Sequence, residues 1–562
     1  MSRKIFVLLF VVRLAAAEYW QSAEWLDLLY YESSGGGYQS LALAPEFFVT
    51  ARGASDPELE YRESLALVRQ NDLDFKLRFP LRYKYLARQD GLPYEPAVIV
   101  SSPYKKAYLA YPNRYIRNPI SIFGHLFLLL DQEWGLPDGQ LVHILADSGD
   151  EPEDLLFYYK GLTGKYIARF WQEPYYRRSK QDSYLESRDV LFYDLGLSAE
   201  QLENLHLHFK EVQNAGFYYY YIDANCALFI GRFLNVVVGR TVVTKQFYLL
   251  PAQVFNAYQR LDPERPVILR ASLVKEFNRR YQLLSAAQKR TVRALLRAET
   301  FSTDREALET FLLISNYVQN NQPQYAGIIR RNRITAYQTL LEIYPQKPQA
   351  RPDAQLIPDF VPVNNRSWQA GWADGYASLA FAPVAFTEYE QLADLEIVNL
   401  RLAAVGLRVG APDWRLKFTP VSLENITQAN AVLPVLSYAL KSSFTYDAQR
   451  GQWGGAQELY AGYAFNLYGR ALVYALGGGD LTNYADFGAA DLRPLALLSG
   501  VKLGLKQPLM ENLDLRLVYE HKYQLDRQSV ELLYKTGNIV GKLGYAQTAE
   551  NTEYSLGLEA LY

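Results

Sequence analysis

The stretch Glu458-Leu459-Tyr460-Ala461-Gly462-Tyr463-Ala464-Phe465 decides how the C-terminal third of the chain folds. Its large apolar side chains Leu459, Tyr463 and Phe465 stand an even number of positions apart, as on one face of a β-strand. Comparable alternating segments, separated by Gly, Asp, Asn and Pro, continue to the C-terminus. Membrane barrel strands need roughly 9 to 11 residues each, so about 200 residues supply about 10 to 12 of them. The pattern predicts an antiparallel transmembrane β-barrel over residues 365–562.

Three further features favour a membrane barrel over the alternative, a soluble β-sandwich. Lys441, Lys502 and Lys506 fall in registers apart from the apolar one, as in a barrel with a polar interior. Aromatic residues make up 14% of the chain, with 45 Tyr, which fits aromatic girdles. The last residue, Tyr562, lies in an alternating segment, and this ending resembles that of outer-membrane barrels.

The N-terminus has the features of an export signal. Met-Ser-Arg-Lys precedes the apolar run from Ile5 to Val12, and Leu14-Ala15-Ala16-Ala17 resembles a cleavage site. We expect residues 1–17 to be a signal peptide; the interruption by Arg13 leaves a short buried helix as the alternative. No other stretch has the 18 or more apolar residues of a membrane-spanning helix.

The chain between signal and barrel divides into four parts. Residues 18–110 are predicted to form a mostly helical extension, and residues 111–250 an α+β domain in which apolar strands and helices alternate. Residues 251–345 have helical periodicity with many Arg and Lys, and residues 346–364, rich in Pro, Gln and Asp, are predicted to be a linker. The net charge of -2, from 58 basic and 60 acidic residues mixed throughout, excludes a basic face for nucleic acid.

The candidate chemistry centres on the single cysteine, which cannot form an internal disulfide. Asp223-Ala224-Asn225 supplies helix-capping residue types directly before Cys226 and an apolar-periodic stretch. Cys226 is therefore predicted in the first turn of a helix. There the helix dipole and unpaired N–H groups would stabilise a thiolate with a depressed pKa, and could also hold an oxyanion.

A histidine is the natural proton partner of such a thiol, and His125 is the leading candidate. It interrupts the apolar segment 122–130, which is predicted to be a buried strand, so it is either a functional group or a satisfied core histidine. His143, between Val142 and Ile144, and Asp131 are both candidates for the group that orients this base. The residues themselves do not choose between the two.

The other three histidines are expected outside the chemistry. His206 and His208 lie on a charged helical stretch, residues 200–214, and are predicted to be solvated. His521 falls in the barrel and is predicted to line its interior. The histidines lack metal-ligand spacing and no glycine-rich phosphate loop is present, so neither a metal nor another cofactor is expected.

Several motifs carry a family resemblance over about residues 110 to 245. Phe123-Gly124-His125-Leu126-Phe127 together with Asn225-Cys226-Ala227 resembles the periplasmic domain of the Lnb lipoprotein N-acyltransferase family. Lys160-Gly161-Leu162 and Glu186-Ser187-Arg188-Asp189 resemble two further blocks of that family, which makes Lys160 and Arg188 supporting candidates beside Asn225. Upstream, Arg78-Phe79-Pro80-Leu81-Arg82 resembles a block in members that also carry a C-terminal barrel.

The resemblance implies a permuted papain-like fold, in which the histidine precedes the cysteine. It implies Cys226 as nucleophile and His125 as general base, and leaves His143 and Asp131 open as the third member. It further implies a site in the bacterial outer membrane with the N-terminal domain in the periplasm, and outer-membrane lipid, lipoproteins or a phospholipid acyl donor as partners. Transfer of an acyl group to an amine or to water remains open. The alternatives are a peptidoglycan cysteine endopeptidase and a non-catalytic barrel with a periplasmic binding domain.

Overall fold

The computed structural model describes most of the chain. The chain divides into two compact units. The first unit is Met1–Leu273 with Pro348–Phe360, and the second is Val274–Lys347 with Val361–Tyr562. In the described part, no helix combines the length and the apolar character needed to cross a bilayer. The described residues are 19–97, 104–113, 121–131, 139–149, 151, 154–179, 186–343, 354–357, 366–373, 375–387, 395–410, 413–430, 432–449, 451–482, 496–522, 525–549 and 551–561.

The first unit begins with short helices and one hairpin. Ser22, Asp56 and Asp72 each accept a backbone N–H at a helix start, which is the capping their side chains favour. The hairpin pairs β1 (Tyr31–Ser34) with β2 (Gly37–Ser40). The elements are η1 (Tyr19–Gln21), α2 (Ala23–Leu28), η2 (Pro45–Phe47), α3 (Pro57–Arg69), α4 (Leu73–Arg78) and α5 (Pro80–Gln89).

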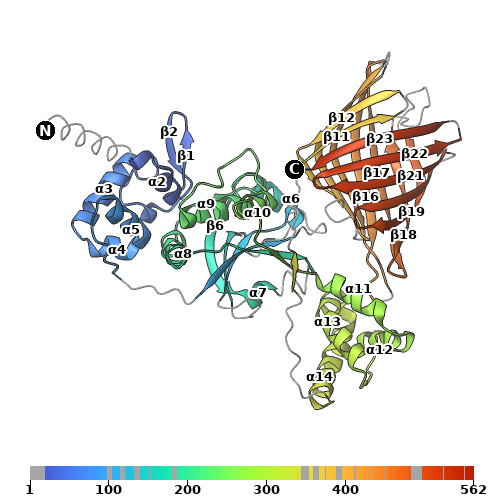
Figure 1. Cartoon of the computed structure of the whole chain (residues 1–562), viewed down its shortest axis with the longest axis horizontal. Coiled ribbons are helices and arrows are strands. Elements are labelled where there is room, and N and C mark those ends of the chain that lie inside the picture. The colour runs from blue at the N-terminus through green and yellow to red at the C-terminus, as the bar shows by residue number, and fades with distance from the viewer. Residues whose placement is uncertain are drawn as a thin grey trace. The chain divides into compact units, whose positions relative to one another are not determined.

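A mixed helix and sheet domain follows, built on an eight-stranded sheet of order β10-β9-β7-β3-β4-β5-β6-β8. Helices α8, α9 and α10 contact this sheet (Figure 1). Tyr175 of α7 packs into a cluster with Tyr108 and Phe127. The α+β fold class is confirmed. The strands are β3 (Lys106–Pro112), β4 (Phe127–Asp131), β5 (Gln140–Asp147), β6 (Tyr166–Pro174), β7 (Val190–Asp194), β8 (Phe217–Tyr219), β9 (Val267–Arg270) and β10 (Ala354–Ile357), and the helices are η3 (Ser121–Phe123), α6 (Leu155–Leu162), α7 (Tyr175–Ser179), α8 (Ala199–Val212), α9 (Cys226–Val238) and α10 (Pro251–Gln259).

The segment around His125 differs from the continuous strand predicted over residues 122–130. It begins with the short helix η3, and β4 starts only at Phe127. Between them Gly124 has φ +78°, and a Cβ there would lie 2.5 Å from the Tyr111 ring. Only glycine fits this position without strain. His125 therefore lies at the approach to the strand rather than inside it.

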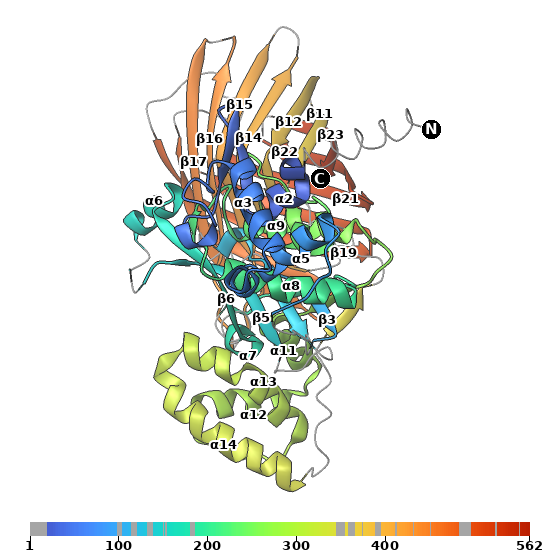
Figure 2. The same cartoon turned by 90° about the vertical axis from the view of Figure 1, so that its left-hand side faces the viewer.

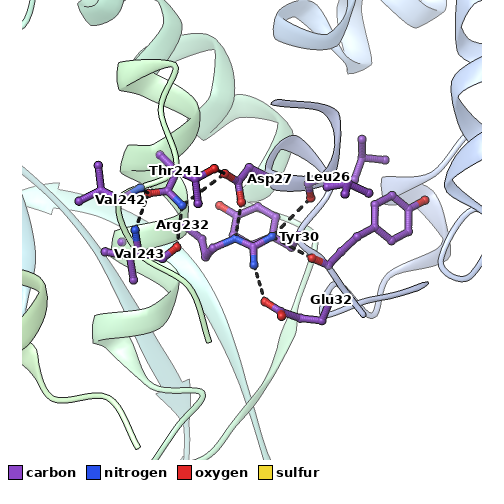
Figure 3. Close-up of polar contacts among 12 residues, drawn as sticks. Leu26, Asp27, Tyr30, Glu32, Arg232, Thr241, Val242 and Val243 are labelled. Carbon is purple, nitrogen blue, oxygen red and sulfur yellow. Dashed lines mark hydrogen bonds and ion pairs between the residues drawn. The ribbon is translucent and has the colours of Figure 1, made fainter. Parts of the chain in front are cut away.

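Buried ion pairs join the N-terminal helices to the rest of the first unit. Arg232 on α9 lies 2.8 Å from Asp27 and also pairs with Glu32 (Figure 3). It donates to the Tyr31 carbonyl at 3.0 Å. Its side chain is almost fully buried. Removing one partner of such a pair leaves a buried charge uncompensated, so these contacts fix α2 and the hairpin against α9.

The second unit contains a helical group and the barrel. Helices α11 to α14 form one group (Figure 2), and their buried side chains share a cluster with Val432, Leu433 and Val435 of the β15–β16 connection. The helical segment predicted over 251–345 is thus divided, because α10 and β9 belong to the first unit. Within the predicted linker, β10 pairs with β9. The helices are α11 (Leu273–Leu283), α12 (Ala286–Arg297), α13 (Arg305–Asn321), η5 (Pro323–Tyr325) and α14 (Ala326–Ile343).

The barrel closes because β11 pairs with both β12 and β23 (Figure 1). Strands β12 and β13 follow each other and both pair with β14, so together they occupy one position in a barrel of twelve strands. This agrees with the predicted 10 to 12. The strands are β11 (Ser367–Ala373), β12 (Tyr376–Ala382), β13 (Val384–Phe386), β14 (Ile397–Val409), β15 (Trp414–Ile426), β16 (Ser437–Asp447), β17 (Gln452–Leu467), β18 (Ala471–Thr482), β19 (Ala496–Met510), β20 (Leu513–Lys522), β21 (Leu525–Thr536), β22 (Ile539–Thr548) and β23 (Thr552–Leu561).

The barrel strands alternate as the sequence predicts. On β17, Leu459, Tyr463 and Phe465 are exposed, while Tyr460 between them is fully buried. Inward charges pair across strands, as Lys506 does with Asp514 at 3.3 Å. An apolar exterior around a polar, closed interior is the arrangement of a membrane barrel, which replaces the soluble sandwich alternative.

Candidate active site

Cys226 is the first residue of α9, which confirms the predicted helix start. Asn225 caps the helix: its side-chain oxygen accepts the Ala227 N–H at 2.9 Å. Its amide nitrogen donates to the Leu249 carbonyl at 2.8 Å and to the Tyr221 carbonyl at 3.1 Å. Asn225 is therefore a positioning residue that fixes the loop before the thiol as well as the helix itself.

Three hydrogen-bond donors influence the pKa of the Cys226 thiol: the backbone amides of Leu126 and Ala227 and the hydroxyl of Tyr219. The Tyr219 oxygen also accepts the Cys226 N–H at 3.2 Å. These donors and the charge of Arg178 lower the pKa of the thiol, but burial outweighs them and the pKa of Cys226 is raised. The expected depressed thiol pKa is therefore wrong for this resting state, because the helix start is buried.

His125 directly precedes Leu126, whose amide lowers the pKa of Cys226. Its backbone N–H donates to the Pro112 carbonyl at 3.2 Å. Among the described residues, its Nε2 is buried and has no hydrogen-bond partner. Burial, followed by the charges of Arg178, His143 and Arg188, holds the pKa of His125 well below its usual value. The imidazole is neutral at neutral pH, which is the form that can accept a proton.

His143 lies in the middle of β5 and is almost completely buried. Its Nε2 is 3.3 Å from a carboxylate oxygen of Glu173, the residue before the end of β6. Burial and then the charge of Arg178 lower the pKa of His143 to about 3. The charge of Arg178 thus acts on Cys226, His125 and His143 alike, which places the three in one electrostatic neighbourhood.

Not every candidate lies in this neighbourhood. Asp131 is six residues beyond His125 at the opposite end of β4, about 20 Å along an extended chain. Lys160 on α6 donates to Glu151 at 2.7 Å, in an exposed ion pair. Arg188 is buried, pairs with Glu186, and its charge acts on His125. The structure therefore brings Arg188 and Asn225 to the site, and gives Asp131 and Lys160 other surroundings.

Three contributors were not predicted from the sequence. Tyr219, Arg178 and Glu173 come from separate elements, and only Tyr219 had a local signal, as part of the aromatic run before Cys226. Two histidines were also misplaced. His208 is fully buried, with Nε2 3.2 Å from the Tyr30 hydroxyl. His521 faces away from the barrel interior, half exposed, and pairs with Asp526 at 2.7 Å.

The fold and this cluster define an outer-membrane barrel protein with a periplasmic domain. Residues 94–260 match the family described as the Lnb N-terminal periplasmic domain, so the chain carries a domain of that family, as the motifs indicated. Residues 17–89 match a family described as a Domain of unknown function (DUF7843). No curated protein sequence matches this chain at a significant level.

Several solved outer-membrane proteins resemble the barrel. A KdgM porin in complex with disordered oligogalacturonate is 11% identical, covering 35% of this chain and 99% of the porin at a TM-score of 0.25. The outer membrane protein Omp33 of Acinetobacter baumannii is 9% identical, covering 35% and 98% at a TM-score of 0.23. At such scores the likeness adds nothing to the topology described above. Among the described residues, no cluster of three or more His, Cys, Asp or Glu could hold a metal ion.

Proposed function

We propose that the periplasmic domain is a thiol-dependent acyltransferase that uses Cys226 as nucleophile and His125 as general base. The observation that carries the proposal is the surrounding of one thiol at the start of α9. The backbone amides of Leu126 and Ala227 favour its thiolate, and His125, directly before Leu126, has a buried Nε2 with no partner among the described residues. An imidazole nitrogen that no protein group engages can accept a proton from the thiol.

The reaction has two steps. In the first, His125 takes the thiol proton, the sulfur attacks an ester carbonyl, and the new C–S bond replaces the C–O bond of the leaving alcohol, which receives the proton. In the second, an amine attacks the thioester, a C–N bond replaces the C–S bond, and the proton lost by the amine passes through His125 to the released thiolate. The Leu126 and Ala227 amides would hold the oxyanion of both tetrahedral intermediates. The resemblance to the Lnb family suggests the N-terminal amine of a lipoprotein as acceptor.

The raised pKa of Cys226 and the lowered pKa of His125 have a consequence for this mechanism. Both groups are neutral at rest, so a thiolate and imidazolium pair forms only at a cost in this buried site. The oxyanion contacts, made only once the substrate carbonyl is in place, offset that cost. The free enzyme should therefore be a poor nucleophile toward simple alkylating agents.

The test is an acyl-transfer assay with the purified full-length protein in lipid vesicles. A diacylated lipopeptide is the acceptor, and N-acylation is read by mass spectrometry. The wild type is expected to transfer, and Cys226→Ser should lose transfer by at least about a thousandfold. Transfer retained by Cys226→Ser would exclude the covalent mechanism. Cleavage of purified muropeptides instead of lipopeptide acylation would favour the peptidoglycan endopeptidase, which shares the same machinery.

A further inference from the structure

The domain that carries Cys226 exposes a group of large apolar side chains on neighbouring elements. Each keeps between 43% and 59% of its surface exposed, although the domain has a core that buries most side chains of this kind. We call this group the α6–β6 surface; its members are Leu156, Tyr159, Leu162, Ile167, Trp171 and Tyr218. Large apolar side chains left exposed on neighbouring elements of a folded domain mark a binding surface.

The helical half of the surface is one face of α6. Leu156, Tyr159 and Leu162 are spaced by three residues, so each lies beside the next on the helix surface. The opposite side is fixed to the domain through Phe157, whose ring centroid lies 5.5 Å from that of Tyr166. The exposed face is therefore held outward by packing.

The strand half of the surface lies at the edge of the sheet. Ile167 and Trp171 point to one side of β6, while Ala168 and Phe170 point to the buried side. Ile167 is paired with Tyr218 of β8, the last strand of the sheet. Because α6 leads directly into β6, the helical and strand halves follow each other along the chain.

The surface borders the candidate site. Tyr218 precedes Tyr219, whose hydroxyl oxygen accepts the Cys226 N–H. The loop that precedes Cys226 also exposes the side chain of Ile222. The Ile222 carbonyl accepts the Leu249 N–H at 2.9 Å. Two residues before Leu249, Phe247 is 94% exposed. Apolar exposure therefore continues from the α6–β6 surface to the loop that positions the thiol.

We propose that the α6–β6 surface docks on the lipid bilayer and presents the Cys226 site to acyl esters anchored there, an inference that rests on the proposed function for its substrate. The chain itself supplies the membrane, because this domain is covalently joined to a bilayer-spanning barrel. Tyr, Trp and Leu are the side chains that occupy a membrane interface. The exposed cations Lys165 and Arg169 lie among these apolar residues and would contact lipid phosphates. Asp147, which pairs with Ile167 across the strands, lowers the net positive charge of the surface.

The direct test places a spin label on the surface of the full-length protein in lipid nanodiscs. Cys226→Ser removes the single native thiol, and Tyr159→Cys then provides the labelling site. The matched control is Arg62→Cys on α3, another exposed helical position. Collision with oxygen, which partitions into lipid, is compared with collision with a water-soluble nickel chelate.

The Tyr159 label is expected to collide several-fold more with oxygen and several-fold less with nickel than the Arg62 label. This contrast should persist in high salt, because apolar insertion dominates a surface of mixed charge. Equal nickel collision at both positions would overturn the proposal. Protection of the Tyr159 label from both reagents would show protein covering the surface, a second copy or the chain itself, and would also overturn it.

A second measurement separates this inference from the proposed chemistry. The double variant Leu156→Ser/Tyr159→Ser is expected to lower transfer from vesicle lipid esters at least tenfold, while alkylation of Cys226 by iodoacetamide stays unchanged. Unchanged transfer would overturn the docking role. If the label contacts lipid but Cys226→Ser still transfers, the mechanism fails and the docking surface stands.

Discussion

Inside the barrel, Lys506 and Asp514 are both fully buried and lie 3.3 Å apart, whereas in the candidate site the buried Nε2 of His125 has no hydrogen-bond partner among the described residues. Both regions bury polar groups in positions where water cannot solvate them. The barrel matches an amine with a carboxylate, and the site leaves a ring nitrogen open. The difference separates buried charges that are compensated within the fold from a neutral ring nitrogen that can accept a proton.

The ion pairs of the first unit resemble the barrel pair, because each buried charge has a partner of opposite charge. Arg232 is almost fully buried but meets Asp27, Glu32 and a backbone carbonyl. His143 is intermediate, because its Nε2 lies near Glu173 while its Nδ1 has no hydrogen-bond partner among the described residues. Substitution should thus cost activity at His125, stability at Arg232 or Asp514, and some of both at His143.

The largest effect is expected at His125. The variant His125→Asn should lower acyl transfer by about 10² to 10⁴, the usual contribution of a positioned general base. Its melting temperature should stay close to that of the wild type, because no hydrogen bond to Nε2 is lost. Transfer rates on vesicle lipid esters check the loss of activity, and thermal unfolding of the same preparation checks the melting temperature. A large loss of stability with little loss of rate would reverse the assignment and make His125 a core residue.

At Asp514 the opposite outcome is expected. Asp514→Ala leaves the amine of Lys506 in the barrel interior without its carboxylate, at a cost of about 3 to 5 kcal/mol. The barrel should lose heat resistance, which a shift of the folded band on gels at increasing temperature measures. The double variant Lys506→Met/Asp514→Leu should recover much of the loss, because it removes both charges. No recovery would mean that the loss does not come from the unpaired charge of Lys506.

The sequence predicted the barrel well because the relevant signal is local. Each barrel strand alternates with a period of two. The same alternation predicts the orientation of His521 correctly: Glu520 and Lys522 point inward, so the residue between them points outward. The error at His208 has a similar cause. Charged neighbours suggested solvation, but His208 lies three residues from Leu205 and four from Val212, on the buried face of α8.

The candidate site could be predicted only in part. Cys226 stood out as the single thiol after a capping sequence, and His125 through the family motif. Arg178 and Glu173 had no local mark, because they meet the histidines only when β5, β6 and α7 pack together. The pKa of the thiol was mispredicted for the same reason: a helix start is visible in a sequence, but the burial that outweighs it is not.

Acid should destabilise the first unit through its buried histidines. Burial lowers the pKa of His208 to about 3, so the folded state binds fewer protons than the unfolded state once the pH falls below about 6.5. At pH 5 this histidine alone removes about 2 kcal/mol of stability, and the loss continues down to its folded pKa. Melting curves of wild type and His208→Phe at pH 7.5 and 5 measure the difference. An equal drop in both proteins would mean that His208 is already charged in the fold.

The smallest effect is expected from removing the charge of Arg178, which acts on Cys226, His125 and His143. Burial raises the pKa of Cys226 and the charge of Arg178 lowers it, so alkylation of the resting protein should accelerate with pH to beyond about 8.5, the value of a free thiol. Arg178→Gln removes the lowering contribution, moves the profile to higher pH, and slows alkylation at pH 8 by a few fold. The same change relieves the depression of the pKa of His125 and His143. Arg178→Lys keeps the charge and should restore the wild-type profile. A thiol that reacts fastest at acidic pH would contradict the buried resting state. It would support the stabilised thiolate that the helix start alone predicts.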